Sequence, residues 1–196
     1  MKLMSFACFF FIFSRSFSQD QYSIRDLKSG KFSDDSSHIY TLPFEQRKNV
    51  FLVQAYESKM SHKGEVALDF KLKKGTKICA ARDGVVIALR RDADKGGLKQ
   101  EYLSEANYIT IRHTDGSVAH YWHLQKNGVN VNPGDTIKTG QIIGYSGNTG
   151  YSAFPHLHFE VQGYNAEGKF VQLPTRFYTN KGIIYLRPGK FYRTVY

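Results

Sequence analysis

The sharpest chemical pattern in this chain of 196 residues is Pro155-His156-Leu157-His158-Phe159-Glu160. Successive side chains of a β-strand alternate between its two faces. His156 and His158 are therefore expected to point to one face, with Leu157 and Phe159 pointing into the core. Two imidazoles on one face can share a metal or a proton, although a surface strand that happens to carry two histidines is an equally ordinary interpretation.

A second segment, residues 61–70, places Asp69 inside an apolar strand pattern, with His62 at its leading edge. A carboxylate in such a pattern is costly to bury unless it is paired or bound to a metal. An exposed aspartate on an edge strand is the simpler alternative.

The third segment is Ala119-His120-Tyr121-Trp122-His123-Leu124. Its two histidines are three residues apart, so alternation predicts opposite faces and only one of them can face a shared site. We expect that one to be His123, with His120 facing away.

Together these segments supply three candidate metal ligands, His62, Asp69 and His158, and two further imidazoles, His123 and His156. A catalytic zinc ion usually has three protein ligands of nitrogen and oxygen type, with water in the fourth position. Bound zinc lowers the pKa of that water and polarises a carbonyl, as amide hydrolysis requires. Nearby histidines can accept the water's proton and stabilise an oxyanion.

The elements that must position these residues are short. Many brief strands separated by turn residues predict an all-β domain with a small antiparallel sheet and few helices. The expected strands are 50–53, 66–70, 77–80, 84–89, 108–111, 118–122, 136–138, 141–145, 157–161 and 183–186. We expect a catalytic domain over 49–165, an irregular polar lead-in over 19–48, and a C-terminal extension over 166–196 that packs on the domain.

Residues 1–18 have the pattern of a secretory signal peptide: one early cation, an apolar run and a polar exit. The run is shorter than a bilayer crossing requires, so no stable membrane span is expected, although an uncleaved anchor is an alternative. The sequence thus predicts an exported protein, periplasmic or secreted. Cleavage removes Lys2, Arg15 and Cys8. The formal charge of +10 falls by two, and Cys79 remains as a buried core residue in a chain without an internal disulfide.

At these residues the chain resembles the zinc metallopeptidases of the lysostaphin and LytM type, which cleave peptide cross-links in bacterial peptidoglycan. The resemblance runs from about residue 61 to 162. Beyond the histidine segments it is carried by Ala80-Ala81-Arg82-Asp83-Gly84-Val85-Val86, Asn107-Tyr108-Ile109-Thr110-Ile111, Gly140-Gln141-Ile142-Ile143-Gly144 and Ser146-Gly147-Asn148-Thr149-Gly150.

The resemblance implies that His62, Asp69 and His158 bind one zinc ion, that His123 and His156 form a catalytic pair, and that the sheet carries a substrate groove. The family's commonest first motif spaces its histidine and aspartate four apart, whereas His62 and Asp69 are seven apart. An odd offset separates strand faces, so His62 must reach the metal from a bent loop. His38 is the substitute ligand if it does not.

The implied partner is peptidoglycan, and the basic charge fits an anionic cell-envelope surface. The alternative is a non-catalytic LytM-like binding or activator module. Degenerate members usually lose ligands, however, and here all five site positions are filled. The basic, aromatic segment 187–193 also resembles a nucleic-acid surface. Export argues against this, so no nucleic-acid partner is expected.

Overall fold

The computed structural model describes residues 38–58, 61–165 and 167–195. Its strands are β1 (Ile39–Thr41), β2 (Asn49–Gln54), β3 (Ala67–Lys71), β4 (Lys77–Cys79), β5 (Gly84–Arg90), β6 (Gly96–Gly97), β7 (Asn107–Arg112), β8 (Val118–Val129), β9 (Thr136–Ile137), β10 (Ile142–Ser146), β11 (Gly150–Tyr151), β12 (His156–Tyr164), β13 (Phe170–Gln172), β14 (Arg176–Thr179), β15 (Gly182–Ile184) and β16 (Lys190–Arg193). Within the described ranges the only helix is a 3-10 turn, η1 (Gln100–Ser104), and no helix is long and apolar enough to cross a membrane. The expected all-β class is confirmed.

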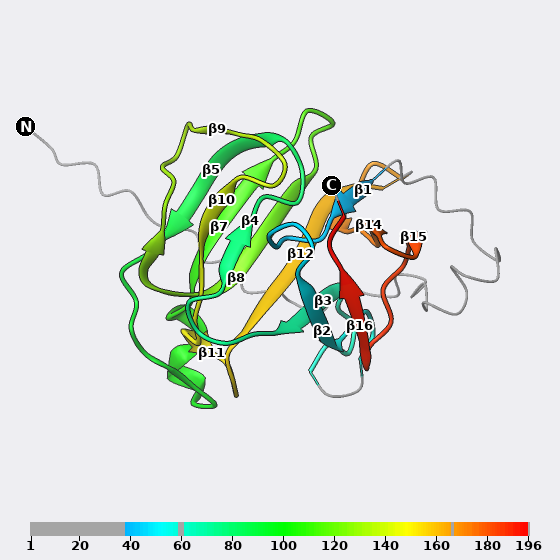
Figure 1. Ribbon diagram of the computed structural model, residues 1–196. Coiled ribbons are helices and arrows are strands. Elements are labelled where there is room, and N and C mark those ends of the chain that lie inside the picture. Colours follow the sequence, from blue (N-terminus) through cyan, green and yellow to red (C-terminus); the bar gives the residue numbers. More distant parts are fainter. Residues whose placement is uncertain (1–37, 59–60, 166, 196) are drawn as a thin grey trace, which may run out of the picture.

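One large sheet carries the architecture, with strand order β16-β2-β3-β12-β8-β7-β5-β9. Strand β13 pairs with β12, and β10 joins β4 to β8. The neighbours along the main path are antiparallel, from β16 through to β9. Figure 1 shows β12 running diagonally through the middle of this sheet, between β3 and β8.

The two faces of the central strands differ in chemistry because side chains alternate along each strand. One face carries fully buried apolar residues such as Leu68, Leu157, Phe159 and Tyr121. The paired positions Asp69, His158 and Trp122 lie on the other face. Burying a large apolar side chain contributes about 1.5–3 kcal/mol. The apolar face therefore fixes the register, and with it the placement of the polar face.

A three-stranded sheet, β1-β14-β15, covers part of the apolar face. The Tyr40 ring of β1 lies 6.0 Å from that of Phe159, and the Phe177 ring of β14 lies 5.8 Å from it. Both contacts are edge-on, an arrangement that aromatic pairs favour. Figure 1 shows β1 and β14 beside β12.

Strand β1 (Ile39–Thr41) lies inside the predicted irregular lead-in over 19–48, whereas residues 42–48 form bends and turns without a strand. Tyr40, Leu42 and Phe44 alternate along the chain and are all buried, and β1 pairs in parallel with β14. The prediction from sequence missed this short apolar alternation because a run of polar residues precedes it. Residues 19–37 and the predicted signal peptide at 1–18 lie outside the described residues.

The segment 167–195 contributes strands to the large sheet and to the three-stranded sheet. Strand β16 pairs with β2 at one edge of the large sheet, while β14 and β15 belong to the small one. The strand predicted at 183–186 is observed as β15, one residue earlier and shorter.

Candidate metal centre and catalytic histidines

His62 reaches the site from the loop that precedes β3, as its spacing from Asp69 requires. Gly64, at φ +80°, turns this loop, and the Glu65 N–H donates to the His62 carbonyl at 3.0 Å. The His62 Nδ1 lies 3.1 Å from the Ala67 carbonyl, to which it can donate only as N–H. This bond leaves Nε2 as the ligand atom, and Nε2 lies 3.1 Å from Asp69 Oδ2.

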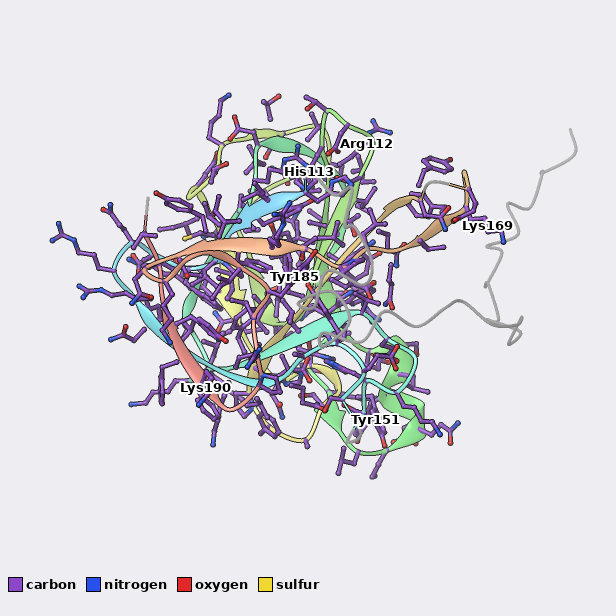
Figure 2. The ribbon with its side chains drawn as sticks, turned by 90° about the vertical axis from the view of Figure 1, so that its right-hand side faces the viewer. Arg112, His113, Tyr151, Lys169, Tyr185 and Lys190 are labelled. Atoms are coloured by element: carbon purple, nitrogen blue, oxygen red, sulfur yellow. The ribbon has the colours of Figure 1, made fainter. Side chains whose placement is uncertain are left out.

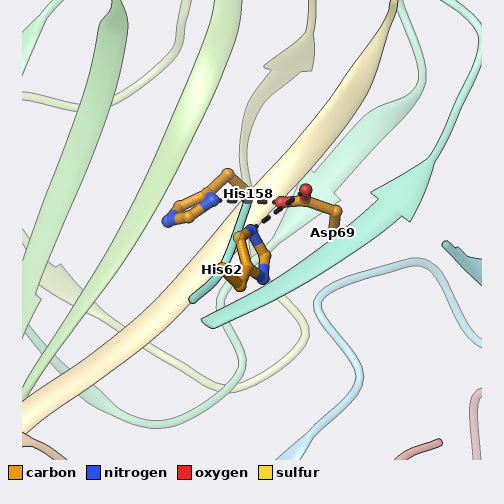
Figure 3. Close-up of side chains that lie close together, drawn as sticks. All are labelled: His62, Asp69 and His158. Carbon is orange, nitrogen blue, oxygen red and sulfur yellow. Dashed lines mark hydrogen bonds and ion pairs between the residues drawn. The ribbon is translucent and has the colours of Figure 1, made fainter. Parts of the chain in front are cut away.

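Asp69 and His158 are brought together by strand pairing, since they are directly opposite in the β3–β12 ladder. The His158 Nδ1 lies 3.0 Å from Asp69 Oδ1. Figure 3 shows the side chains of His62, Asp69 and His158 converging, with the Asp69 carboxylate in contact with both imidazoles. One ligand atom from each lies within 4.8 Å of the others.

This donor set fits a zinc ion in both geometry and chemistry. Two imidazoles and a carboxylate are ordinary zinc ligands, and the ligand atoms of a tetrahedral site lie roughly 3.4 Å apart. The histidine nitrogens lie 3.0 and 3.1 Å from the carboxylate oxygens of Asp69. Small movements of these side chains would therefore allow their ligand atoms to hold one ion.

The electrostatics of the cluster also favour a cation. Burial acts against charge on His158, but hydrogen bonds to Asp69 and Glu160 outweigh it and raise the pKa of His158 to about 10. Burial likewise opposes ionisation of Asp69, yet hydrogen bonds from His158 and His62 hold its pKa well below the usual range. The site therefore stabilises positive charge between these groups, where a metal ion would replace the proton.

His123 and His156 lie beside this cluster, with their ring centroids 4.6 Å apart. The His123 Nδ1 lies 2.7 Å from the Thr149 carbonyl, and the His156 Nδ1 lies 2.8 Å from the Phe154 carbonyl. Each Nδ1 therefore carries the proton, and Nε2 carries the lone pair. The His156 Nε2 lies 3.6 Å from Asp69 Oδ1.

Both histidines are poor at holding a positive charge. Burial, with the nearby His156 and His158, lowers the pKa of His123 to about 3. Burial also lowers the pKa of His156, against the opposing effect of Asp69. Both are therefore neutral imidazoles at neutral pH, the form that can accept a proton.

The expectation that His120 and His123 point to opposite faces is wrong. His120 is paired with Glu160 in the β8–β12 ladder, so it lies on the site face of the sheet. His123 has a left-handed backbone, at φ +64°, which breaks the alternation and turns its side chain to the same side. A positive φ in a residue other than glycine is uncommon and often marks a functional position.

The motifs assign no role to Glu160 or Asn107, and the structure shows what each of them contacts. Glu160 is buried and accepts hydrogen bonds from Gln162 and Gln172, with one oxygen 3.9 Å from the His158 Nε2. Asn107 is fully buried, and its amide bonds the backbone of Ala93 and Leu124. Glu160 thus lies next to a ligand, whereas Asn107 supports the loop contacts around β7.

The substitute ligand His38 is not needed, and it lies in a different cluster. Its Nδ1 is 3.2 Å from Asp115, which also pairs with Arg82. Figure 2 shows the neighbouring His113 at the opposite end of the molecule from Tyr151, whose strand β11 adjoins the loop that contacts His123. Cys79 is fully buried, as expected.

Sequence reasoning missed one contact to the ligands, that of Gln54. Its amide lies 2.8 Å from Asp69 Oδ2. Gln54 ends an apolar strand and belongs to no recognisable motif, so no sequence signal identified it.

An all-β domain that gathers two histidines and an aspartate around one point, with two neutral histidines beside them, has the site of a zinc metallopeptidase. The family comparison agrees. The model of peptidase family M23 matches residues 61–172, more than half of the chain, and the chain belongs to this family.

Several curated proteins are similar over this region. The chain is 40% identical over 94 residues to an uncharacterised metalloprotease of Buchnera aphidicola, covering 48% of this chain and 22% of that protein. It is 35% identical over 115 residues to the glycyl-glycine endopeptidase ALE-1 of Staphylococcus capitis, covering 59% and 29%. It is 37% identical over 116 residues to the peptidoglycan DD-endopeptidase ShyC of Vibrio cholerae, covering 58% and 23%. The chain therefore spans less than a third of the length of each of these relatives.

Proposed function

We propose that this protein is an exported, zinc-dependent endopeptidase that hydrolyses peptide cross-links of bacterial peptidoglycan. The observation that carries the proposal is the complete set of five site residues: His62, Asp69 and His158 around one point, and His123 and His156 beside it. The names of two relatives, a glycyl-glycine endopeptidase and a peptidoglycan DD-endopeptidase, support the substrate class.

In this proposal His62, Asp69 and His158 hold the ion. When bound there, zinc lowers the pKa of a coordinated water and polarises the scissile carbonyl. The residues of this chain do the rest. His156 and His123 present unprotonated Nε2 atoms, because their Nδ1–H groups are engaged by the Phe154 and Thr149 carbonyls.

One of the two histidines accepts the proton of the attacking water, and either can stabilise the oxyanion that develops. Their low pKa values keep them neutral over the physiological range. The substrate groove predicted from the resemblance would lie on the polar face of the large sheet, and the basic surface would favour an anionic cell envelope.

The test is to incubate the mature protein with purified peptidoglycan, with and without a chelator, and to identify the released fragments by mass spectrometry. New peptide termini that disappear with chelator are the expected result, and they identify the bond that is cut. A zinc-loaded protein that releases nothing contradicts the peptidoglycan assignment. A protein that neither releases fragments nor binds zinc would instead be the non-catalytic binding module.

A further inference from the structure

The strand β2 lies outside residues 61–172, the part of the chain matched by the family model, yet it reaches the metal ligands. It does so through Gln54, its last residue. The Gln54 side chain is buried, at 5% exposure. A buried amide must find hydrogen-bond partners, and those of Gln54 lie around the metal site.

A β-bulge aims Gln54 at this site. Leu52 is paired with Phe70, whose side chain lies on the apolar face of the sheet. Alternation alone would send Gln54, two residues later, to that same apolar face. The register instead shifts between Leu52 and Gln54, so that Gln54 lies opposite Asp69. Such an extra residue in one strand re-aims the side chains that follow, and bulges of this kind are common beside active sites.

Every hydrogen-bonding group of the Gln54 amide is used. Its Nε2 donates to Asp69 Oδ2 at 2.8 Å and to Ser61 Oγ at 2.7 Å. Its Oε1 accepts from the Ser61 N–H at 3.2 Å. The reversed amide would place its oxygen against a carboxylate and its NH₂ against an N–H donor, so these bonds fix the orientation.

One side chain therefore holds two ligands in place. The bond to Asp69 fixes an oxygen of the carboxylate, while the two bonds to Ser61 anchor the loop that carries His62, the next residue. The loop needs such an anchor because His62 does not belong to a strand and lies seven residues from Asp69.

We propose that Gln54 is a positioning residue of the metal centre, which sets the affinity for zinc by fixing the Asp69 carboxylate and the His62 loop together. The inference rests on the metal site used by the proposed peptidase. It adds a contact from a strand beyond the region that the family model matches. Partners that orient metal ligands typically change metal affinity by about 10- to 100-fold when they are removed.

The test measures zinc affinity on the full mature chain by competition with a chromogenic chelator. Gln54→Met keeps the length of the side chain but removes its donors and acceptor. Gln54→Asn keeps the amide but withdraws it by one carbon–carbon bond, about 1.5 Å. Both variants are expected to bind zinc about 10- to 100-fold more weakly, and the absorption spectrum of the cobalt-substituted protein is expected to change.

Thr194→Val is the matched control. The buried Thr194 hydroxyl accepts from the Lys48 N–H at 2.8 Å and donates to the Glu45 carbonyl at 2.5 Å, at the far end of β2 from Gln54. The control is expected to lose thermal stability, while its zinc affinity stays within about threefold of the wild type.

Folded Gln54 variants with wild-type zinc affinity would overturn the inference. So would a control that loses as much affinity as they do, or a finding that neither Gln54 variant folds, since Gln54 would then serve the fold alone. The zinc measurement uses no peptidoglycan, so its result does not depend on the proposed substrate. A wild type that binds zinc but releases no fragments in the separate peptidoglycan assay contradicts only the proposed function.

Discussion

Replacing His156 and His158 separately should divide metal binding from catalysis, although the two residues are neighbours on one face of β12. His158→Ala removes one of the three candidate ligands, whose Nδ1 lies 3.0 Å from Asp69 Oδ1. His156→Ala leaves those ligands intact. We expect His158→Ala to lose zinc and activity together, whereas His156→Ala keeps zinc and loses activity.

The magnitude follows from the role of each group. Removing a positioned general acid or base typically costs about 10²- to 10⁴-fold in rate, or about 3–5 kcal/mol of transition-state stabilisation. His156 is held by its bond to the Phe154 carbonyl and lies 3.6 Å from Asp69. Its loss should therefore lower kcat by that factor at saturating zinc. For His158→Ala, the loss of zinc affinity should exceed the about 10- to 100-fold typical of removing a partner of a ligand.

The assay combines zinc content after dialysis with the rate of fragment release from peptidoglycan. Thermal unfolding of both variants shows that each is folded. If His156→Ala loses zinc while His158→Ala retains it, the ligand assignment is wrong. If both keep full activity, the site is elsewhere.

Three further predictions concern metal removal, acid stability and packing. A chelator should lower the melting temperature, since zinc at 100 times its dissociation constant stabilises the native state by about 2.7 kcal/mol. The pKa of His123 is about 3 in the native state, whereas its ordinary value is 6.5. As the pH falls, His123 therefore takes up its proton in the unfolded chain before it does so in the native state. The free energy of unfolding should thus fall as pH drops from 6.5 towards 3, and His123→Gln should flatten that fall in urea titrations of the metal-free protein. Gly147→Ala would bring a Cβ to 2.4 Å from the Gln125 nitrogen, so urea unfolding should show a loss of about 1–3 kcal/mol.

Much of the fold was predictable because it depends on local alternation. The ten strands expected from short apolar runs all have observed counterparts, from β2 to β15. Strand β1 was not predicted, and its pairing partner β14 is distant in sequence. Tyr40 is buried against Phe159 and Phe177, and no local sequence pattern indicates contacts with residues so far along the chain.

The candidate site shows the same division. His156 and His158 share a face because they are two residues apart in a strand, a local rule that the sequence displays. The side of His123 agrees with the prediction, but that of His120 does not, because the left-handed backbone of His123 lets both histidines lie on the site face. Gln54 reaches Asp69 only because a bulge shifts the β2 register, and the residue types of β2 do not indicate this bulge.

The sequence by itself determined the residue types of the site, the strand periodicity and the all-β class, because these depend on the chemistry and spacing of near neighbours. Only the tertiary structure decided that Asp69 lies opposite His158, that the His62 loop folds back onto them, and that Gln54 joins the two. The physical reason is that strand register and backbone reversals are set by burial of the whole apolar face, summed over residues far apart in the chain.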